Sequence, residues 1–341
     1  MKTMKILVTG GLGFMGSAFI RHILQKNKQI KVINLDKVTY AANFDNLKEC
    51  RGFYRFKQRY HFVKGDIADQ KIVRRAAQGC QAIINYAAET HVDRSILDPD
   101  AFVKTDVLGT YNLLEAARDL KIKKFIQIST DEVYGDVAKG YSREGDTIRP
   151  SSPYSASKAG GDMLVLAYHR TFGVPTVLTR ASNNYGPYQY PEKIVPLFIT
   201  NLLEGKKVPV YGKGDQVRDW LFVEDHARAI AKLLTRGRPG EIYNIGSDRH
   251  RDITNLELTK QILKLTSHDK KSIKYVKDRP GHDVRYAINC NKLKKLGWRP
   301  QVNFRDGLKL TVDWYRNNHW WWKKIKTGEY LKYYKKQYGK K

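Results

Sequence analysis

Residues 4–16 read MKILVTGGLGFMG: a short apolar run, then a cluster of glycines. Gly11, Gly13 and Gly16 satisfy the spacing G-x-G-x-x-G, and Gly10, Gly13 and Gly16 satisfy G-x-x-G-x-x-G. Between a strand and a helix, such glycines allow a tight turn, a close approach of the backbone to a pyrophosphate, and close packing of the helix on its strand. The stretch therefore predicts a dinucleotide-binding Rossmann unit at the start of the chain.

Asp36 strengthens this prediction because it stands 20 residues after Gly16 (36 − 16 = 20), at the end of the next predicted strand. A carboxylate at this position accepts a hydrogen bond from the ribose 2′-hydroxyl of NAD and repels the 2′-phosphate of NADP. NAD is therefore the expected cofactor; a carboxylate that only caps a turn is the alternative interpretation. Asp66 and Ile67, after the third predicted strand, are candidates for the adenine end of the cofactor.

Short β-branched runs alternate with helical patterns through the first half of the chain. This alternation predicts an α/β protein with a parallel, doubly wound sheet whose strands are buried on both faces. Strands are expected at residues 5–9, 31–35, 61–64, 82–85, 124–129 and 175–180. Helices are expected at residues 14–26, 101–119 and 153–172.

The pattern changes after about residue 182, where turn-rich pieces follow one another. We therefore expect an NAD-binding Rossmann domain over residues 1–182 and a smaller C-terminal α/β domain for the substrate, mainly over residues 183–341. A helical pattern and an apolar run within residues 221–247 predict that this segment returns to the first sheet.

The chain is strongly basic, since 62 Lys and Arg residues against 34 Asp and Glu residues leave a net charge of +28. Such an excess keeps nucleic-acid binding as a hypothesis, but it attracts an anionic small molecule equally well. The 3 cysteines form no CxxC pair, which favours reduced thiols in a cytoplasmic protein over a disulfide framework or a zinc site. No apolar stretch approaches the ~20 residues of a membrane span, so we expect no membrane association.

Tyr154 and Lys158 lie four residues apart in the helical pattern that begins at residue 153. Residues at this spacing share one face of a helix, so the ammonium group is expected near the phenol. A nearby positive charge favours the phenolate, and we therefore expect a lowered pKa for Tyr154. Such a tyrosine can take a proton from a sugar hydroxyl near neutral pH.

The glycine loop together with the Tyr154–Lys158 pair resembles the extended short-chain dehydrogenase/reductase family. Within that family the match narrows to the dTDP-glucose 4,6-dehydratases, and it runs over nearly the whole chain. The matching motifs are NYAAETHVDRS (85–95), STDEVYG (129–135), SNNYGPY (182–188), PEK (191–193), VRDW (217–220) and RPGHD (279–283). Departures from the family pattern are mild; one is Asp106, which follows Thr105 where asparagine is common.

The resemblance implies removal of water from dTDP-glucose, with a hydride that bound NAD accepts and then returns. Tyr154 would take the proton of the carbon-4 hydroxyl, Thr130 would hydrogen-bond that hydroxyl, and Lys158 would hold the tyrosine acidic. Glu132 would then remove the carbon-5 proton as a base, and Asp131 would protonate the leaving carbon-6 hydroxyl. Two adjacent carboxyls can divide these roles because the charge of one raises the pKa of the other. In isolation, the two acids would be interpreted as a solvated turn.

The resemblance also implies the ligand-binding residues, and a homodimer formed through the helices at 101–119 and 153–172. For NAD these residues are Gly10, Gly13, Phe14, Met15, Gly16, Asp36, Lys37, Thr39, Asp66, Ile67, Ala87, Ala88, Thr105, Tyr154, Lys158 and Asn184. For the nucleotide sugar they are Glu89, Thr130, Asn183, Lys193, Ile194, Pro209, Tyr211, Arg218, Asn255, Arg279, His282 and Asp283. No histidine has a second ligand at metal spacing, so no metal is expected.

Alternatives remain within the same superfamily: a 4-epimerase, a decarboxylase, or a dehydratase that uses a UDP-sugar. Epimerases have Ser or Thr at this strand end without the paired acids, which favours the dehydratase. A nucleic-acid-binding protein with a vestigial dinucleotide fold is the alternative from another class, and the complete set of Tyr154, Lys158, Asp131 and Glu132 argues against it. The sequence does not explain the lysine-rich tail.

Overall fold

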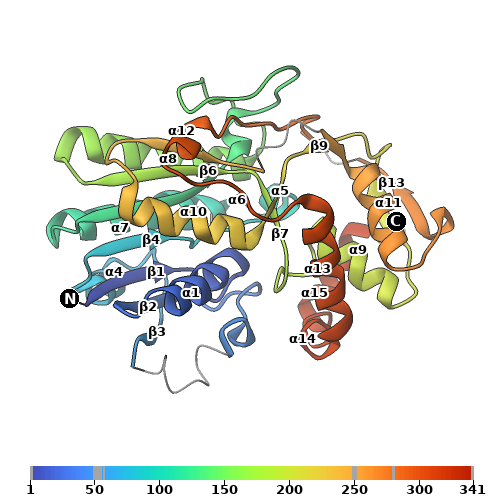
Figure 1. Ribbon diagram of the computed structural model, residues 1–341, viewed down its shortest axis with the longest axis horizontal. Helices are drawn as coiled ribbons and strands as arrows, with labels where there is room; N and C mark the ends of the chain where they lie inside the picture. The colour runs from blue at the N-terminus through green and yellow to red at the C-terminus, as the bar shows by residue number, and fades with distance from the viewer. Residues whose placement is uncertain (1–2, 49–55, 57, 248–251, 279–280, 339–341) are drawn as a thin grey trace.

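The computed structural model describes residues 3–48, 56, 58–247, 252–278 and 281–338 of the 341-residue chain (Figure 1). One of the three cysteines, Cys50, and the predicted substrate residue Arg279 lie outside this part of the chain. No helix within the described ranges is long and apolar enough to cross a membrane.

A seven-stranded sheet forms the larger part of the molecule, in the order β11-β6-β5-β4-β1-β2-β3, with every neighbouring pair parallel. Its strands are β1 (Met4–Thr9), β2 (Ile30–Asp36), β3 (Tyr60–Lys64), β4 (Ala82–Asn85), β5 (Lys124–Thr130), β6 (Thr176–Ala181) and β11 (Ile242–Ile245). The strand order runs outward from β1 through β2 to β3 on one side and from β4 through β5 to β6 on the other, so it reverses between β1 and β4. In sheets of this type, ligands bind in the crevice at the carboxyl ends of the strands, where the order reverses. The predicted doubly wound parallel sheet is confirmed.

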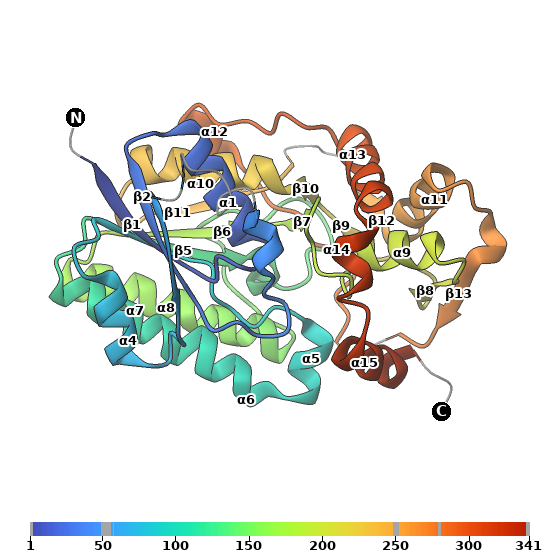
Figure 2. The same ribbon diagram turned by 90° about the horizontal axis from the view of Figure 1, so that it is seen from below.

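Helices cover both faces of this sheet, as Figure 2 shows. One face carries α1 (Phe14–Lys26), α10 (Val223–Arg236) and α12 (Asn291–Lys295); the other carries α4 (Gln70–Ala77), α7 (Thr110–Asp119) and α8 (Pro153–Phe172). The alternation of side chains along β1 explains the two layers of core. Ile6 and Val8 are fully buried in the cluster that contains α1, and Leu7 is fully buried in the cluster that contains α7.

The helix expected at residues 101–119 changes its winding in the middle. It consists of α6 (Pro99–Phe102), the π-helical segment η2 (Val103–Gly109) and α7. Opposite η2, helix α8 carries Gly160 and Gly161, and a Cβ at Gly161 would lie 2.7 Å from the carbonyl oxygen of Asp106. The two glycines therefore let η2 pack closely on α8. Single π turns of this kind are frequent at functional sites.

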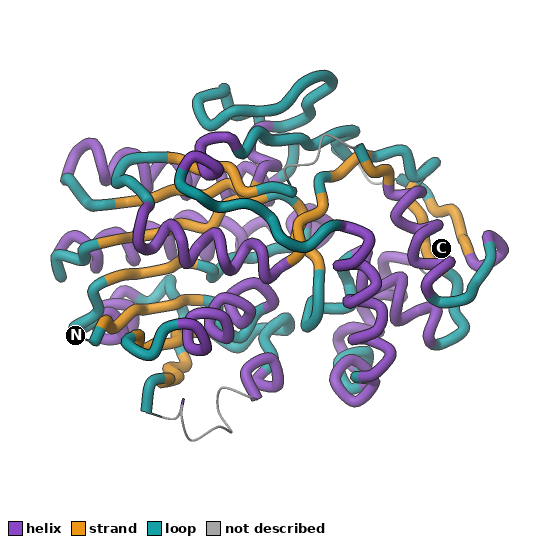
Figure 3. Tube along the Cα trace, in the orientation of Figure 1, coloured by secondary structure: helices purple, strands orange, loops and turns teal. Residues whose placement is uncertain are grey.

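The remaining elements form a smaller lobe beside the large sheet, as the tube in Figure 3 shows. Its helices are α9 (Ile194–Leu203), α11 (Asn255–Leu265), α13 (Phe304–Asn317), α14 (His319–Lys323) and α15 (Gly328–Tyr338). Three two-stranded sheets pair β7 (Asn183–Tyr185) with β10 (Trp220–Phe222), β9 (Val217–Arg218) with β12 (Ile253–Thr254), and β8 (Val208–Tyr211) with β13 (Ile273–Val276). The lobe has its own aromatic core, which includes Tyr315, Trp321 and Trp322.

Short helices follow three strands of the large sheet at the edge where the site lies. They are η1 (Phe44–Leu47) after β2, α5 (Val92–Leu97) after β4 and η3 (Asp131–Tyr134) after β5. A fourth, η4 (Lys270–Ser272), precedes β13 in the smaller lobe. The carboxyl ends of β1, β2, β4 and β5 thus all open toward the side where ligands bind in sheets of this type.

Candidate active site

The glycine loop connects β1 to α1 and has no room for side chains at two positions. Gly10 has a φ of +65°, and a Cβ there would lie 2.7 Å from the backbone nitrogen of Ala87. A Cβ at Gly16 would come closer than 3.0 Å to the carbonyl oxygen of Gly10. Helix α1 begins at Phe14 with no side-chain cap, since its N-cap is Gly13. The positive end of its dipole is therefore available to an anion such as a pyrophosphate.

Asp36 ends β2 and holds the glycine loop from the side. Its carboxylate accepts hydrogen bonds from the backbone N–H groups of Leu12 (2.9 Å) and Val38 (2.8 Å). Burial raises the pKa of Asp36, and these two backbone hydrogen bonds act against that rise. Each carboxylate oxygen retains a second lone pair, which suits a ribose hydroxyl.

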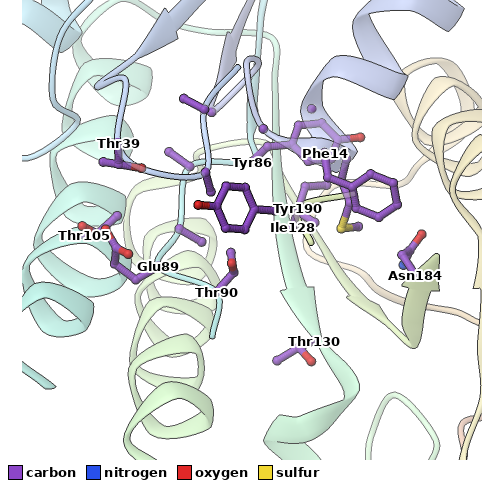
Figure 4. A pocket seen from close by; sticks show the side chains of 18 of the residues that line it. Phe14, Thr39, Tyr86, Glu89, Thr90, Thr105, Ile128, Thr130, Asn184 and Tyr190 are labelled. Carbon is purple, nitrogen blue, oxygen red and sulfur yellow. The ribbon is translucent and has the colours of Figure 1, made fainter. Parts of the chain in front are cut away.

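A cleft runs from the glycine loop across the strand ends to η3 and the start of α8. Every residue predicted to bind NAD lines this cleft, as do Thr130, Asp131, Glu132, Glu89, Asn183 and Lys193. In Figure 4 the ring of Tyr190 lies in the middle of the lining side chains, with Thr39 on one side and Asn184 on the other. The structure thus brings the predicted cofactor residues and all five predicted catalytic residues to one cavity.

Helix α8 fixes the positions of Tyr154 and Lys158 in this cleft. Ser152 caps the helix in a reciprocal capping box with Ser155, and a proline follows at the first helical position, so the helix begins sharply at residue 153. Lys158 is 4% exposed, and its Nζ donates to the carbonyl oxygen of Ile128 at 2.9 Å. The ring of Tyr154 meets the ring of Phe102 edge to face. Both side chains are therefore held against the strand ends.

The expected lowering of the Tyr154 pKa is wrong for this structure. Desolvation by burial raises the pKa of Tyr154 well above its ordinary value of 10.0, and the charges of Glu132 and Asp106 raise it further. A hydrogen bond with Thr130 acts in the opposite direction. Burial and the neighbouring carboxylates thus outweigh the hydrogen bond with Thr130.

Asp131 and Glu132 follow β5 directly, in the short helix η3. The Thr130 hydroxyl caps this helix, accepting from the Glu132 backbone N–H at 3.2 Å. Asp131 is 2% exposed, and burial raises its pKa well above the ordinary value, with the charges of Glu132 and Asp219 adding to the rise. Glu132 is only half-buried. Burial therefore favours the protonated form of one carboxyl beside another that lines the cleft, an arrangement that suits an acid–base pair.

A second pocket adjoins the cleft and extends into the smaller lobe, sharing Glu132, Asn183 and Lys193 with it. The predicted substrate residues Ile194, Pro209, Tyr211, Arg218, Asn255 and His282 line this pocket. The guanidinium group of Arg218 donates to the carbonyl oxygens of Val217 (2.7 Å) and Asp283 (2.9 Å) and lies 4.3 Å from the ring centroid of Tyr286. These contacts fix the guanidinium group at the pocket wall.

Asp283, predicted to contact the substrate, is not among the residues that line either pocket. Its carboxylate instead accepts hydrogen bonds from the hydroxyl groups of Ser151 and Tyr286, and its carbonyl oxygen holds Arg218. Asp283 therefore orients three neighbours. The sequence pattern could not tell a residue that lines a pocket from one that supports such a residue.

Comparison with known proteins matches nearly the whole chain to sugar-nucleotide dehydratases. The model of the GDP-mannose 4,6 dehydratase family matches residues 7–311. A dTDP-glucose 4,6-dehydratase of Streptomyces niveus is 49% identical over 329 residues, covering 95% of this chain and 96% of that protein. The dTDP-glucose 4,6-dehydratase 1 of Escherichia coli strain K12 is 47% identical over 362 residues, covering 98% and 99%. The chain belongs to the dTDP-glucose 4,6-dehydratase family.

Solved structures of dTDP-glucose 4,6-dehydratases have the same fold. The enzyme of Streptomyces venezuelae, solved with NAD bound, superposes with a TM-score of 0.91 at 47% identity, covering 94% of this chain and 100% of that one. The UDP-glucose 4-epimerase of Thermotoga maritima, solved with UDP-glucose, superposes with a TM-score of 0.84 at only 30% identity, covering 93% and 100%. The family membership expected from the motifs is confirmed, and the dehydratases are more similar than the epimerase.

Part of the second pocket of this dTDP-glucose 4,6-dehydratase family member could not be predicted from its sequence. Tyr338 lines it from the end of α15, inside the lysine-rich tail that had no explanation. The preceding residue, Gln337, donates to the hydroxyl of Tyr211 at 2.7 Å and to a carboxylate oxygen of Asp93 at 3.3 Å. These contacts join positions 126 and 244 residues apart, so no local motif could have indicated them.

Proposed function

We propose that this protein is an NAD-dependent hydro-lyase that converts dTDP-glucose to dTDP-4-keto-6-deoxyglucose. The observation that carries the proposal is the presence of Asp131 and Glu132 in the same cleft as Tyr154 and Lys158. Oxidation at carbon 4 needs only the tyrosine, the lysine and the cofactor, whereas elimination needs two further proton carriers. The identity to named dTDP-glucose 4,6-dehydratases supports the same substrate.

Bound NAD supplies the redox chemistry, accepting hydride from carbon 4 and giving it back at carbon 6. The chain fits this cofactor because Gly10 and Gly16 leave the backbone bare where a pyrophosphate would lie against the amino end of α1. Asp36 stands where a carboxylate favours NAD over NADP, beside Lys37, which pairs with Asp66 at 2.7 Å. The other cofactor residues named above complete the wall of the cleft.

Tyr154 acts as the base for the carbon-4 hydroxyl, which Thr130 hydrogen-bonds. Lys158 stands four residues along the same helix, held by the carbonyl of Ile128, and its charge favours the phenolate once the proton leaves. Oxidation of carbon 4 acidifies the proton on carbon 5. In this first half-reaction the chain places the sugar against Tyr154, whose phenolate accepts the proton of the carbon-4 hydroxyl.

Glu132 then removes the carbon-5 proton, and Asp131 protonates the carbon-6 hydroxyl so that it leaves as water. Burial raises the pKa of Asp131 and so favours the protonated form that an acid requires, and Glu132 lines both pockets. Arg218 and Lys193 line the second pocket, where their positive charges suit the diphosphate of the substrate. The high net charge of the chain also attracts such an anion.

Glu132→Gln tests the assignment of the base. We expect turnover to fall by roughly 10²–10⁴-fold, the usual contribution of a general base, with no solvent deuterium entering carbon 5. Glu241→Gln is the matched control, since Glu241 lines neither pocket and pairs with Lys292, and it should leave turnover unchanged. Carbon-5 exchange that persists in the Glu132 variant would show that another group is the base. A 4-epimerase would give dTDP-galactose from the wild-type protein and no loss of water.

We also propose a homodimer that forms through η2, α7 and α8. Large apolar side chains are exposed on these elements: Val103 (55%), Leu108 (44%), Tyr111 (38%), Met163 (44%) and Phe172 (51%). Contiguous exposed apolar side chains of this kind mark interaction surfaces. Met163→Lys should therefore shift the protein from dimer to monomer in analytical ultracentrifugation; a wild-type protein that sediments as a monomer would refute the dimer.

The proposed compartment is the cytoplasm, where thiols stay reduced. Cys80 and Cys290 are both buried, away from oxidants in solvent. We place nucleic-acid binding last among the candidate functions, because the residues of both pockets serve a small anionic ligand. Steeply salt-dependent binding to DNA would be the observation in its favour.

A further inference from the structure

Four charged side chains are buried on or against helix α8, which also carries Tyr154. Lys158, Asp162, Arg180 and Asp106 are 4%, 0%, 2% and 1% exposed. Arg180 pairs directly with Asp162, with 3.1 Å between Nε and Oδ2. Lys158 has electrostatic interactions with both carboxylates, and Asp106 is the one that Arg180 does not pair with. A buried charge needs a partner of opposite sign, so Asp106 supplies the countercharge for the ammonium of Lys158.

The position of Asp106 is closely defined. It lies on the π-helical segment η2, where its Oδ2 accepts from the Ser157 hydroxyl at 2.8 Å and its carbonyl oxygen accepts from the Thr110 hydroxyl at 2.7 Å. The backbone of η2 reaches this depth because Gly161 leaves room on α8. The carboxylate is therefore held next to the residue that precedes Lys158.

Charged groups from several elements face this arrangement. Tyr154 is influenced by Glu132 and Asp131 from η3 and by Asp106 from η2, with the hydroxyl of Thr130 beside it. Asp106 in turn faces Lys158 and Asp162 from α8 and Glu89 beyond β4, and Figure 4 shows Glu89 among the cleft residues beside Thr105. Burial raises the pKa of Asp106 to about 6 and that of Glu89 to about 7. Asp106 is therefore ionised through most of the neutral range.

An asparagine at position 106 would keep the shape of the side chain but not its charge. An amide oxygen can accept from Ser157 as a carboxylate does, so the hydrogen bond alone does not require aspartate. With asparagine, the buried cluster of two cations and two anions would have a net charge of +1. The difference that aspartate makes is thus electrostatic, and it acts on the neighbouring phenol.

We propose that Asp106 is a positioning residue for proton transfer by Tyr154: its carboxylate balances the buried ammonium of Lys158 and holds the proton on the phenol, so that carbon-4 oxidation needs a higher pH than it would with asparagine. The consequence for turnover rests on the proposed function. The effect on the charge of Tyr154 does not, and it can be measured without substrate.

The test is a pH titration of Tyr154 by NMR on the full-length protein with carbon-labelled tyrosine, in which Tyr154→Phe assigns the resonance. Asp106→Asn should move the Tyr154 transition down by about one pH unit, a roughly tenfold change in proton affinity for the loss of one nearby charge. Asp100→Asn is the matched control, because Asp100 pairs with Lys104 on the surface of the same helical run. It should leave the transition in place.

The pH profile of kcat/KM with dTDP-glucose gives the second readout. Its acid limb should shift down by about one pH unit in Asp106→Asn and not in Asp100→Asn. Asp106→Ser, a smaller uncharged replacement, takes the place of Asn if the amide disturbs packing on Gly161. If Asp106→Asn or Asp106→Ser is folded and Tyr154 titrates in it at the same pH as in the wild type, the inference is overturned. A shifted titration in a protein that never dehydrates dTDP-glucose leaves it standing and refutes the proposed function instead.

Discussion

Replacing Gly16 with alanine tests the cofactor site with one added carbon atom. The new Cβ would come within 3.0 Å of the carbonyl oxygen of Gly10 and lie 2.9 Å from the Cα of Gly11, so backbone must move. Overpacking of this kind costs about 1–3 kcal/mol. The better helix propensity of alanine recovers at most about 1 kcal/mol. The clash prevails, and because it distorts the loop on which the pyrophosphate lies, we expect NAD affinity to fall by roughly 5- to 150-fold.

Isothermal titration calorimetry with NAD measures this loss directly, after bound cofactor has been removed. Gly145→Ala is the matched control, because a Cβ at Gly145 meets nothing within 4 Å and this glycine does not have a positive φ. The control should bind NAD as the wild type does. If Gly16→Ala also binds NAD with wild-type affinity, the glycine loop does not hold the pyrophosphate and the cofactor site must lie elsewhere.

Three further changes have defined outcomes. Asp36→Asn should weaken NAD binding and reduce the preference for NAD over NADP, because the charge that repels a 2′-phosphate is lost. An unchanged ratio of NAD to NADP affinity in competition titrations would argue against this role of Asp36. Burial raises the pKa of Asp106 in the folded protein from 3.8 to about 6. The free energy of unfolding of the wild type, measured in urea, should therefore fall relative to that of Asp106→Asn by about 1 kcal/mol as the pH rises from 5 to 7.5. A pH-independent difference would contradict this. Trp321→Ala should cost about 3–5 kcal/mol, because it empties a fully packed site and removes the hydrogen bond to Asn46; a smaller loss would mean that the core collapses around the gap.

Helix α8 shows how much of this fold local sequence can predict. Its expected span, residues 153–172, is the observed Pro153–Phe172. Both ends are set by neighbours in the chain: Ser152 caps the start, and Gly173, with a φ of +68°, ends the helix in a left-handed conformation. Strands such as β1 are equally local, because a buried parallel strand needs an unbroken apolar run. The glycine loop and Asp36 could be placed for the same reason.

Features that depend on distant residues could not be predicted. The π turn at η2 forms against two glycines of another helix, about fifty residues away, and a helical pattern gives no sign of it. Tyr338 reaches the second pocket through packing of α15 on Tyr211 and Asp93. The predicted direction of the Tyr154 pKa shift was wrong because the spacing to Lys158 is visible in the sequence, whereas the burial of the phenol and the convergence of carboxylates from η2 and η3 are not.

The fate of the carbon-4 hydrogen decides whether this chain performs the proposed reaction. The protein is incubated with dTDP-glucose deuterated at carbon 4, without added NAD, and the product is examined by mass spectrometry and NMR. We expect loss of one water, with the deuterium retained and found at carbon 6. Deuterium that remains at carbon 4 in a product of unchanged mass would instead indicate an epimerase. Deuterium lost to solvent would exclude transfer of the hydride from carbon 4 to the cofactor and back to the same sugar.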